Sequence, residues 1–242
     1  MMIRSNIKMA DVIIQNHHLL AIINRFGIKL GFGEQTVAEV CSSYNIPVEF
    51  FLEIVNAFND PDFFPKKNMY SFPLSLIIDY LFKAHDYYIN VKVPEIKGLI
   101  EKVTKTKDIK TQKAVLLIQA FFNEYADQLK KHIKREEEKV YPYILELENV
   151  FDSKEQNKIN EFKSKYNFRI DDYAIEHEDI EEKLYDIKNL IIKYISPKDN
   201  YIIYFKILGQ LAHLEEDIND HSEMENKVLI PRVRIMEKAI YN

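Results

Sequence analysis

Two segments of the chain place a histidine, a glutamate and a proline at identical spacing. Each has the form H-x3-E with a proline ten residues after the histidine: His132, Glu136 and Pro142 in HIKREEEKVYP, and His221, Glu225 and Pro231 in HSEMENKVLIP. Residues four apart on a helix are neighbours on one face, one turn from each other. Each segment is therefore expected to aim one imidazole and one carboxylate at the same point.

Two single histidines complete the pattern. His85 in KAHDYY and His177 in IEHEDI each lie on an inward stripe of a helical segment that precedes an H-x3-E pair. The separation is 47 residues from His85 to His132 and 44 residues from His177 to His221. The sequence thus resembles two related helical hairpins, each supplying one histidine and then an H-x3-E pair.

This residue set suits a buried pair of metal ions. An ionised glutamate is very costly to bury without a partner, and cations would provide one. Imidazole and carboxylate suit iron, zinc, manganese or copper, and two carboxylates can each bridge two metals. With an oxo or hydroxo bridge, room remains for an exogenous ligand, which favours redox-active iron over a closed zinc site. We therefore predict two iron ions per chain and six ligands: His85, His132, Glu136, His177, His221 and Glu225.

Other polar residues near these motifs have simpler interpretations. A single H-x3-E is usually a partly exposed helix pair, and only the contribution of all four helices makes metal binding the better explanation. Solvent exposure is expected for the adjacent pair His17 and His18 and for Glu137, Glu138 and Glu176. His213 is expected at the surface or behind the ligands, and Tyr88 and Tyr125 are expected mainly in the core. No catalytic residue is assigned.

Four long amphipathic segments must position these side chains. They are expected at about 71–103, 112–147, 153–195 and 200–239. Pro94 is expected to kink the first segment or to end its first part, and the third segment is expected to break near Asn167. The second carries an inward stripe with steps of three and four residues, which is typical of a helix: Val115, Ile118, Phe122, Tyr125, Leu129, His132, Glu136 and Val140. Short polar connections join the segments, so we predict an all-α antiparallel four-helix bundle.

A small helical unit precedes the bundle. Helices are expected over 10–26, 36–44 and 47–58, with Thr36 and Glu39 forming a capping box and Pro47 near a helix start. A proline-containing segment follows. We therefore predict an N-terminal domain over 1–60, a linker over 61–71 and the bundle over 72–242.

Composition excludes several classes of protein. The 242 residues include only 5 glycines and 1 cysteine, Cys41, and the formal charge is −5. Scarce glycine suits an all-α fold, a mild negative charge disfavours a nucleic-acid partner, and a single cysteine forms no intramolecular disulfide. No signal peptide or membrane-spanning stretch is evident, so we expect a cytoplasmic protein without a membrane partner.

These motifs resemble the hemerythrin HHE cation-binding domain over about residues 72–240. HSEMENKVLIPR is similar to the last ligand helix of the repair-of-iron-centres (RIC, ScdA-type) family, H-x-H-L-E-N-x-x-L-F-P-R, with His221 and Glu225 aligned. HIKREEEKVYP is similar to that family's second-helix pattern. The resemblance implies a hemerythrin-like bundle with a non-haem di-iron centre.

The N-terminal unit is similar to the small domain that precedes the RIC bundle, and the chain departs from the family at two places, one in this unit and one in the bundle. Leu30, Gly31, Phe32 and Gly33 stand where the family has a Cys-Cys-Gly-Gly turn, so thiol chemistry attributed to those cysteines is absent. Ser222 and Glu223 stand where it has Ile-His, which removes one histidine near the site. Cys41 remains, and a lone helical cysteine is usually a buried apolar residue.

The resemblance implies a role in nitrosative or oxidative stress, through iron donation to damaged iron–sulfur clusters or through handling of nitric oxide. The implied partners are O2 or NO and iron–sulfur proteins. The alternatives are hemerythrin-like binding, storage or sensing of O2 without turnover, with the N-terminal unit as an oligomerisation or partner module, and an oxidase- or peroxidase-like enzyme. A homodimer is kept as a candidate assembly.

Overall fold

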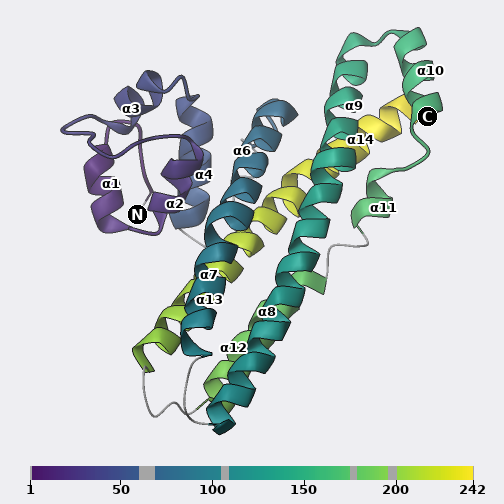
Figure 1. Ribbon diagram of the computed structural model, residues 1–242. Helices are drawn as coiled ribbons and strands as arrows, with labels where there is room; N and C mark the ends of the chain where they lie inside the picture. The colour runs from purple at the N-terminus through teal and green to yellow at the C-terminus, as the bar shows by residue number, and fades with distance from the viewer. Residues whose placement is uncertain (1, 60–68, 105–108, 175–178, 196–200, 242) are drawn as a thin grey trace. The chain divides into compact units, whose positions relative to one another are not determined.

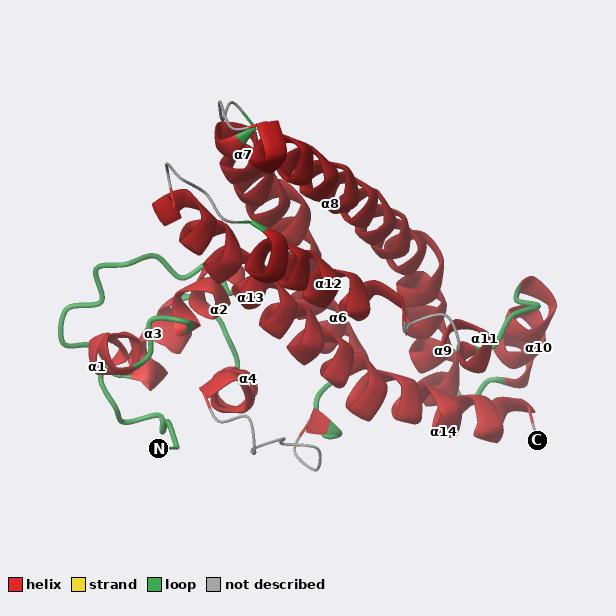
Figure 2. Ribbon diagram, turned by 90° about the horizontal axis from the view of Figure 1, so that it is seen from below, coloured by secondary structure: helices red, strands yellow, loops and turns green. Residues whose placement is uncertain are grey.

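The described part of the chain is helical throughout. The computed structural model describes residues 2–59, 69–104, 109–174, 179–195 and 201–241, with side chains left undescribed at 109–110, 174 and 179–182. Within those ranges the only extended pairing is a single antiparallel bridge between Lys8 and Thr36, and Figure 2 shows helices joined by loops. The all-α prediction is confirmed. None of the described helices is long and apolar enough to cross a membrane.

The chain divides into two compact units, residues 1–84 and 85–242. The division falls inside α6 (Leu74–Tyr87). Most of the predicted linker, 61–71, lies outside the described residues. The predicted domain boundaries therefore stay a prediction.

Before α6, the described residues of the N-terminal unit form the short helices α1 (Met9–Gln15), α2 (Leu19–Arg25), α3 (Val37–Ser43) and α4 (Val48–Asn59). The capping box of Thr36 and Glu39 is present at the start of α3, as predicted. The expected single helix over 10–26 is wrong, because the chain breaks at Asn16. This residue has an extended backbone, and its side-chain oxygen accepts a hydrogen bond from the His18 N–H at 3.0 Å.

The bundle is a ring of four antiparallel helices in the second unit. α7 (Val93–Val103) packs against α8 (Ile109–Arg135), α8 against α12 (Asp179–Tyr194), α12 against α13 (Tyr201–Met224), and α13 against α7. Their facing stripes are buried and apolar: Ile96, Ile100, Phe122, Leu129, Leu184, Ile187, Leu211 and Leu214. The stripe predicted for the second segment thus correctly identified the inner face of α8, where Val115, Ile118 and Phe122 are buried.

Two of the bundle helices continue as long rods beyond the ring. Figure 1 shows α9 (Tyr141–Ser153) extending the line of α8 and α14 (Ile230–Tyr241) extending the line of α13. The segment between α9 and α12 forms α10 (Gln156–Lys165), packed on α9, and α11 (Ile170–Ala174), packed on α14. The predicted break near Asn167 is confirmed, since Tyr166 ends α10 with an extended backbone.

Three wide turns of π-helix occur in the described residues, one between α6 and α7 and one within each rod. They are η1 (Tyr88–Lys92), η2 (Glu136–Val140) and η3 (Glu225–Leu229), and in each a backbone N–H bonds to the carbonyl five residues earlier. Each turn begins six residues before a proline: Pro94, Pro142 and Pro231. Proline has no N–H and clashes with the carbonyl four residues earlier, and a wider turn accommodates this. Pro94 was expected to kink or end its helix, and the structure instead has a π turn before it.

Candidate metal centre

Five of the six predicted ligands converge inside the second unit. His85 lies in the last turn of α6, His132 in α8 and His221 in α13, while Glu136 and Glu225 are the first residues of η2 and η3. Ligand atoms of His85, Glu136 and His221 all lie within 4.8 Å of one another. The sixth, His177, lies outside the described residues. The spacing argument thus predicted a real cluster, and the role of its members as metal ligands stays a prediction.

Glu136 lies between two histidines. Its Oε1 is 2.7 Å from His132 Nε2, the residue one turn earlier, and its Oε2 is 3.0 Å from His85 Nε2. The glutamate has no exposed surface and His85 is 2% exposed, whereas the His132 side chain is 19% exposed. The H-x3-E pair therefore aims both side chains at one point, as the helical spacing predicted.

Glu225 is held in a different way. Its Oε1 accepts a hydrogen bond from the Tyr141 hydroxyl at 2.8 Å and lies 3.6 Å from His221 Nε2. The two histidine nitrogens His85 Nε2 and His221 Nε2 face each other at 3.2 Å. Both carboxylates and both of these imidazoles are buried. The candidate ligand atoms of the two H-x3-E motifs therefore lie together in one site shielded from solvent.

Two tyrosines complete the cluster, and the sequence analysis did not assign them to it. The Tyr173 hydroxyl donates to Glu136 Oε1 at 2.5 Å and lies 3.5 Å from Glu225 Oε2. The Tyr141 ring stacks parallel to His85, with centroids 5.6 Å apart. Tyr173 lies three residues after Ile170 and four before His177, a helical spacing that was a usable signal. Tyr141 was not on the regular stripe of its helix.

Glu137 was expected in solvent, and this expectation is wrong. Its Oε1 lies 3.0 Å from His85 Nδ1, and its side chain is only 35% exposed. A histidine that ligates a metal through one ring nitrogen commonly donates its other N–H to a carboxylate, which fixes the ring and its tautomer. Glu137 is placed to do this for His85, leaving His85 Nε2 directed at the cluster.

The electrostatics of the cluster fit a cation. Burial opposes the charged form of His85, but contacts with Glu136 and Glu137 and the charge of Glu225 raise its pKa to about 9. Burial, followed by the charges of Glu225 and Glu136, raises the pKa of Tyr141 and of Tyr173 well above the usual range. Two fully buried carboxylates need positive charge nearby. A metal ion held by Nε2 and carboxylate oxygens satisfies that requirement, so the residues present fit such a group.

The remaining polar residues mostly follow expectation. His17, His18, His213 and Glu138 are exposed, and Tyr125 is buried. The Tyr88 hydroxyl donates to the backbone oxygen of Asp217 at 3.0 Å, and the centroid of the Tyr88 ring lies 5.8 Å from that of His221. Glu176 lies outside the described residues. Cys41 is fully buried, and burial raises the pKa of its thiol to about 12, so it stays protonated.

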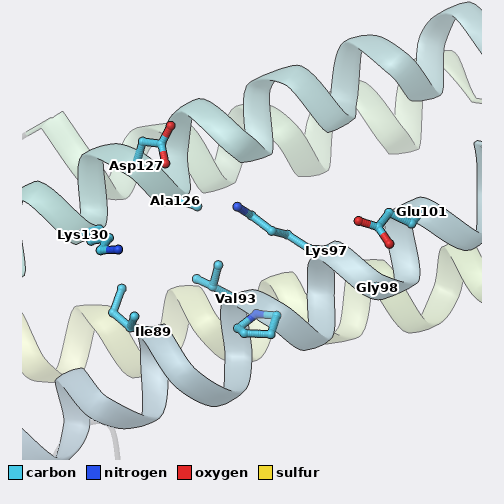
Figure 3. Close-up of a pocket in the computed structure, with 9 residues that line it drawn as sticks. Ile89, Val93, Lys97, Gly98, Glu101, Ala126, Asp127 and Lys130 are labelled. Carbon is cyan, nitrogen blue, oxygen red and sulfur yellow. The ribbon is translucent and has the colours of Figure 1, made fainter.

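A surface groove elsewhere in the bundle is separate from this cluster. It has a volume of about 440 Å³ and lies between α7 and α8, with Lys97, Asp127 and Lys130 in its lining. Figure 3 shows the Lys97 side chain extending from α7 towards α8. None of the lining residues is a predicted ligand, so the groove is not the candidate metal centre.

Comparison with known proteins agrees with this arrangement. The family model for the hemerythrin HHE cation binding domain matches residues 94–233. Two curated relatives, both named iron-sulfur cluster repair protein ScdA and both from strains of Staphylococcus epidermidis, are 22% identical to the chain over 228 residues. The match covers 93% of this chain and 96% of each relative. The similarity therefore extends over both units and not over the bundle alone.

Proposed function

Because the chain belongs to the family of the hemerythrin HHE cation binding domain, we propose that its buried histidine–glutamate cluster holds two iron ions and acts on damaged iron–sulfur clusters. The observation that carries the proposal is that two fully buried glutamates, Glu136 and Glu225, lie 3.0 Å from His85 and 3.6 Å from His221, whose Nε2 atoms are themselves 3.2 Å apart. A bound iron pair would supply redox-active metal with room for a small ligand such as NO or O2. The setting would be nitrosative or oxidative stress.

Each candidate ligand would have its own part in binding such a pair of ions. Glu136 and Glu225 would bridge, because each enters from a different rod and each has two oxygens. His85 and His221 would bind on the side where their Nε2 atoms meet, and His132 would bind on the opposite side of Glu136. His177 is proposed as the remaining ligand. The enclosed position of the carboxylates would exclude bulk water from the ions.

Similarity along nearly the whole chain to proteins named for iron–sulfur cluster repair supports the repair role. Part of the iron bound at the site would then be transferred to the damaged cluster. Partial exposure of His132 supports release from that side, since it is the most exposed of the five described candidate ligands. An iron–sulfur protein would be the recipient.

One observation favours a second candidate, reversible O2 binding or sensing without turnover. The turn that carries Cys-Cys in the RIC family is occupied here by Leu30 to Gly33, with Leu30 71% exposed and Phe32 buried. Cys41, the single cysteine of the chain, is buried and protonated at neutral pH. A repair reaction that needs thiols from the N-terminal unit is therefore unsupported in this chain.

A repair assay separates the two candidates. The iron-loaded protein is incubated anaerobically with an NO-damaged iron–sulfur dehydratase, and recovered dehydratase activity and iron lost from this protein are both measured. The repair role predicts recovery beyond that given by an equal amount of free ferrous iron, and no such recovery with a Glu136→Ala variant. No recovery, together with an O2-dependent spectrum that reverses under vacuum, would establish the carrier instead.

A further inference from the structure

Tyr141 joins the two halves of the cluster although it belongs to the rod that carries Glu136. It is the first residue of α9 and has no exposed surface. Its hydroxyl donates to Glu225 Oε1 at 2.8 Å and lies 3.5 Å from His85 Nε2. The hydroxyl therefore contacts the carboxylate of the other rod and a histidine of α6, from a position that the regular helical stripe does not include.

The π turn explains how Tyr141 reaches this place. His132, Glu136 and Tyr141 follow one another at steps of four and five residues. In a regular α-helix a residue five positions on lies about 140° around the axis, away from the site. Here the Tyr141 N–H bonds to the Glu136 carbonyl, five residues earlier, so the turn is wider. That wider turn returns Tyr141 to the face of Glu136.

The equivalent position of the other rod shows that the tyrosine is not a consequence of the turn alone. The N–H of Ile230 bonds to the Glu225 carbonyl in the same way, and Ile230 is buried. Its side chain has no polar atom. The π turn is thus common to both rods. Only the first rod supplies a hydroxyl at this position, that of Tyr141, and it donates to the carboxylate of the other rod.

We propose that Tyr141 is a positioning residue of the metal centre, which orients the Glu225 carboxylate through its hydrogen bond to Oε1. This inference rests on the proposed metal site and adds a residue that acts through Glu225. Glu136 is approached by His132 at 2.7 Å and by Tyr173 at 2.5 Å, whereas His221 lies 3.6 Å from Glu225. Tyr141 supplies at 2.8 Å the restraint that His221 does not. One bonded lone pair leaves the carboxylate able to bind metal.

The chain offers a matched control in Tyr143, two residues further along α9. It is also fully buried, and its hydroxyl donates to the Glu237 carboxylate at 2.5 Å, which also accepts from the Ile170 N–H at 2.9 Å. Tyr143→Phe therefore removes a buried tyrosine–carboxylate hydrogen bond from the same helix. Glu237 is not among the predicted ligands, so loss of packing and loss of the metal-centre contact can be separated.

The test measures ferrous iron binding by chelator competition under anaerobic conditions, with the optical spectrum of the cobalt(II)-loaded protein as a second readout. Tyr141→Phe is expected to weaken iron binding by about tenfold or more, as for other residues that orient metal ligands, and to change the cobalt spectrum. At saturation it still takes up two ions. Tyr143→Phe is expected to retain the wild-type affinity and spectrum.

A Glu225→Ala variant separates failure of this inference from failure of the metal site. If Tyr141→Phe matches the wild type in affinity and spectrum while Glu225→Ala binds fewer ions, Tyr141 only packs and the inference is overturned. If Glu225→Ala also binds like the wild type, the proposed site itself is wrong. If both tyrosine variants weaken binding equally, general loss of packing explains the effect and the inference is again overturned.

Discussion

The rods α8–η2–α9 and α13–η3–α14 carry the same H-x3-E motif with a proline six residues after the glutamate, yet they surround their glutamates differently. In the first, Glu136 has His132 at 2.7 Å and Tyr173 at 2.5 Å. In the second, His221 is 3.6 Å from Glu225, and the contact at 2.8 Å comes from Tyr141 of the first rod. The two halves have equivalent backbones but different hydrogen bonding.

This difference separates what a motif determines from what its neighbours determine. The spacing of histidine, glutamate and proline sets the helical face and the π turn within one rod. The donors that fix each carboxylate come from other elements, Tyr173 from α11 for Glu136 and Tyr141 from α9 for Glu225. A two-fold sequence pattern therefore produces a centre whose two carboxylates are unequal.

The largest expected effect comes from removing either carboxylate. Glu136→Ala should lose both ions, because Glu136 contacts two of the candidate histidines, His85 and His132. Glu225→Ala should retain one weakly bound ion. Metal per chain after anaerobic loading and desalting measures both. Equal retention of ions in the two variants would remove the proposed inequality between the half-sites.

A smaller effect is expected from deleting one exposed residue of each π turn, Lys139 in η2 or Lys227 in η3. Either deletion allows a regular α turn while the buried stripe beyond it stays in register, so the far-ultraviolet circular dichroism should be retained. Deletion of Lys139 puts Tyr141 four residues after Glu136, which keeps it on the same helical face, so ferrous iron binding should weaken by no more than about tenfold. Deletion of Lys227 should weaken it by less, since Ile230, beyond η3, brings no polar atom. A loss of more than about tenfold in the Lys139 variant would contradict this account of the turns.

The smallest effect is expected for Tyr173→Phe. Glu136 keeps His132 and His85 after the substitution, so the affinity for ferrous iron should fall by less than about tenfold, and by less than in Tyr141→Phe. The same chelator competition measures it. The reverse order of the two tyrosine variants would show that Glu136, and not Glu225, depends more on its tyrosine.

Much of this centre was predictable because helical periodicity is simple. The steps from Val115 to Val140 predicted the inner face of α8 and η2, and the four-residue spacing predicted the convergence of His132 with Glu136. The π turns were missed because a stripe of threes and fours assumes a regular helix, although a glutamate six residues before each of Pro142 and Pro231 was visible. Tyr141 was missed for the same reason.

Other features depend on tertiary contacts that no local pattern contains. Glu137 looked like one of three solvated glutamates, and only the approach of His85 from another helix gives it a role. The break at Asn16 is local, but it depends on which backbone N–H the asparagine side chain accepts from. His177 was predicted from its stripe, and its place in the centre is open to direct test by His177→Ala.

The central claim is that the buried cluster holds a pair of iron ions bridged by Glu136 and Glu225. The most direct measurement is iron per chain, determined together with the optical spectrum, on protein purified anaerobically and then oxidised. The account predicts about two irons per chain and the absorption of a bridged ferric pair. Stoichiometric zinc that iron cannot replace, or no bound metal, would contradict it.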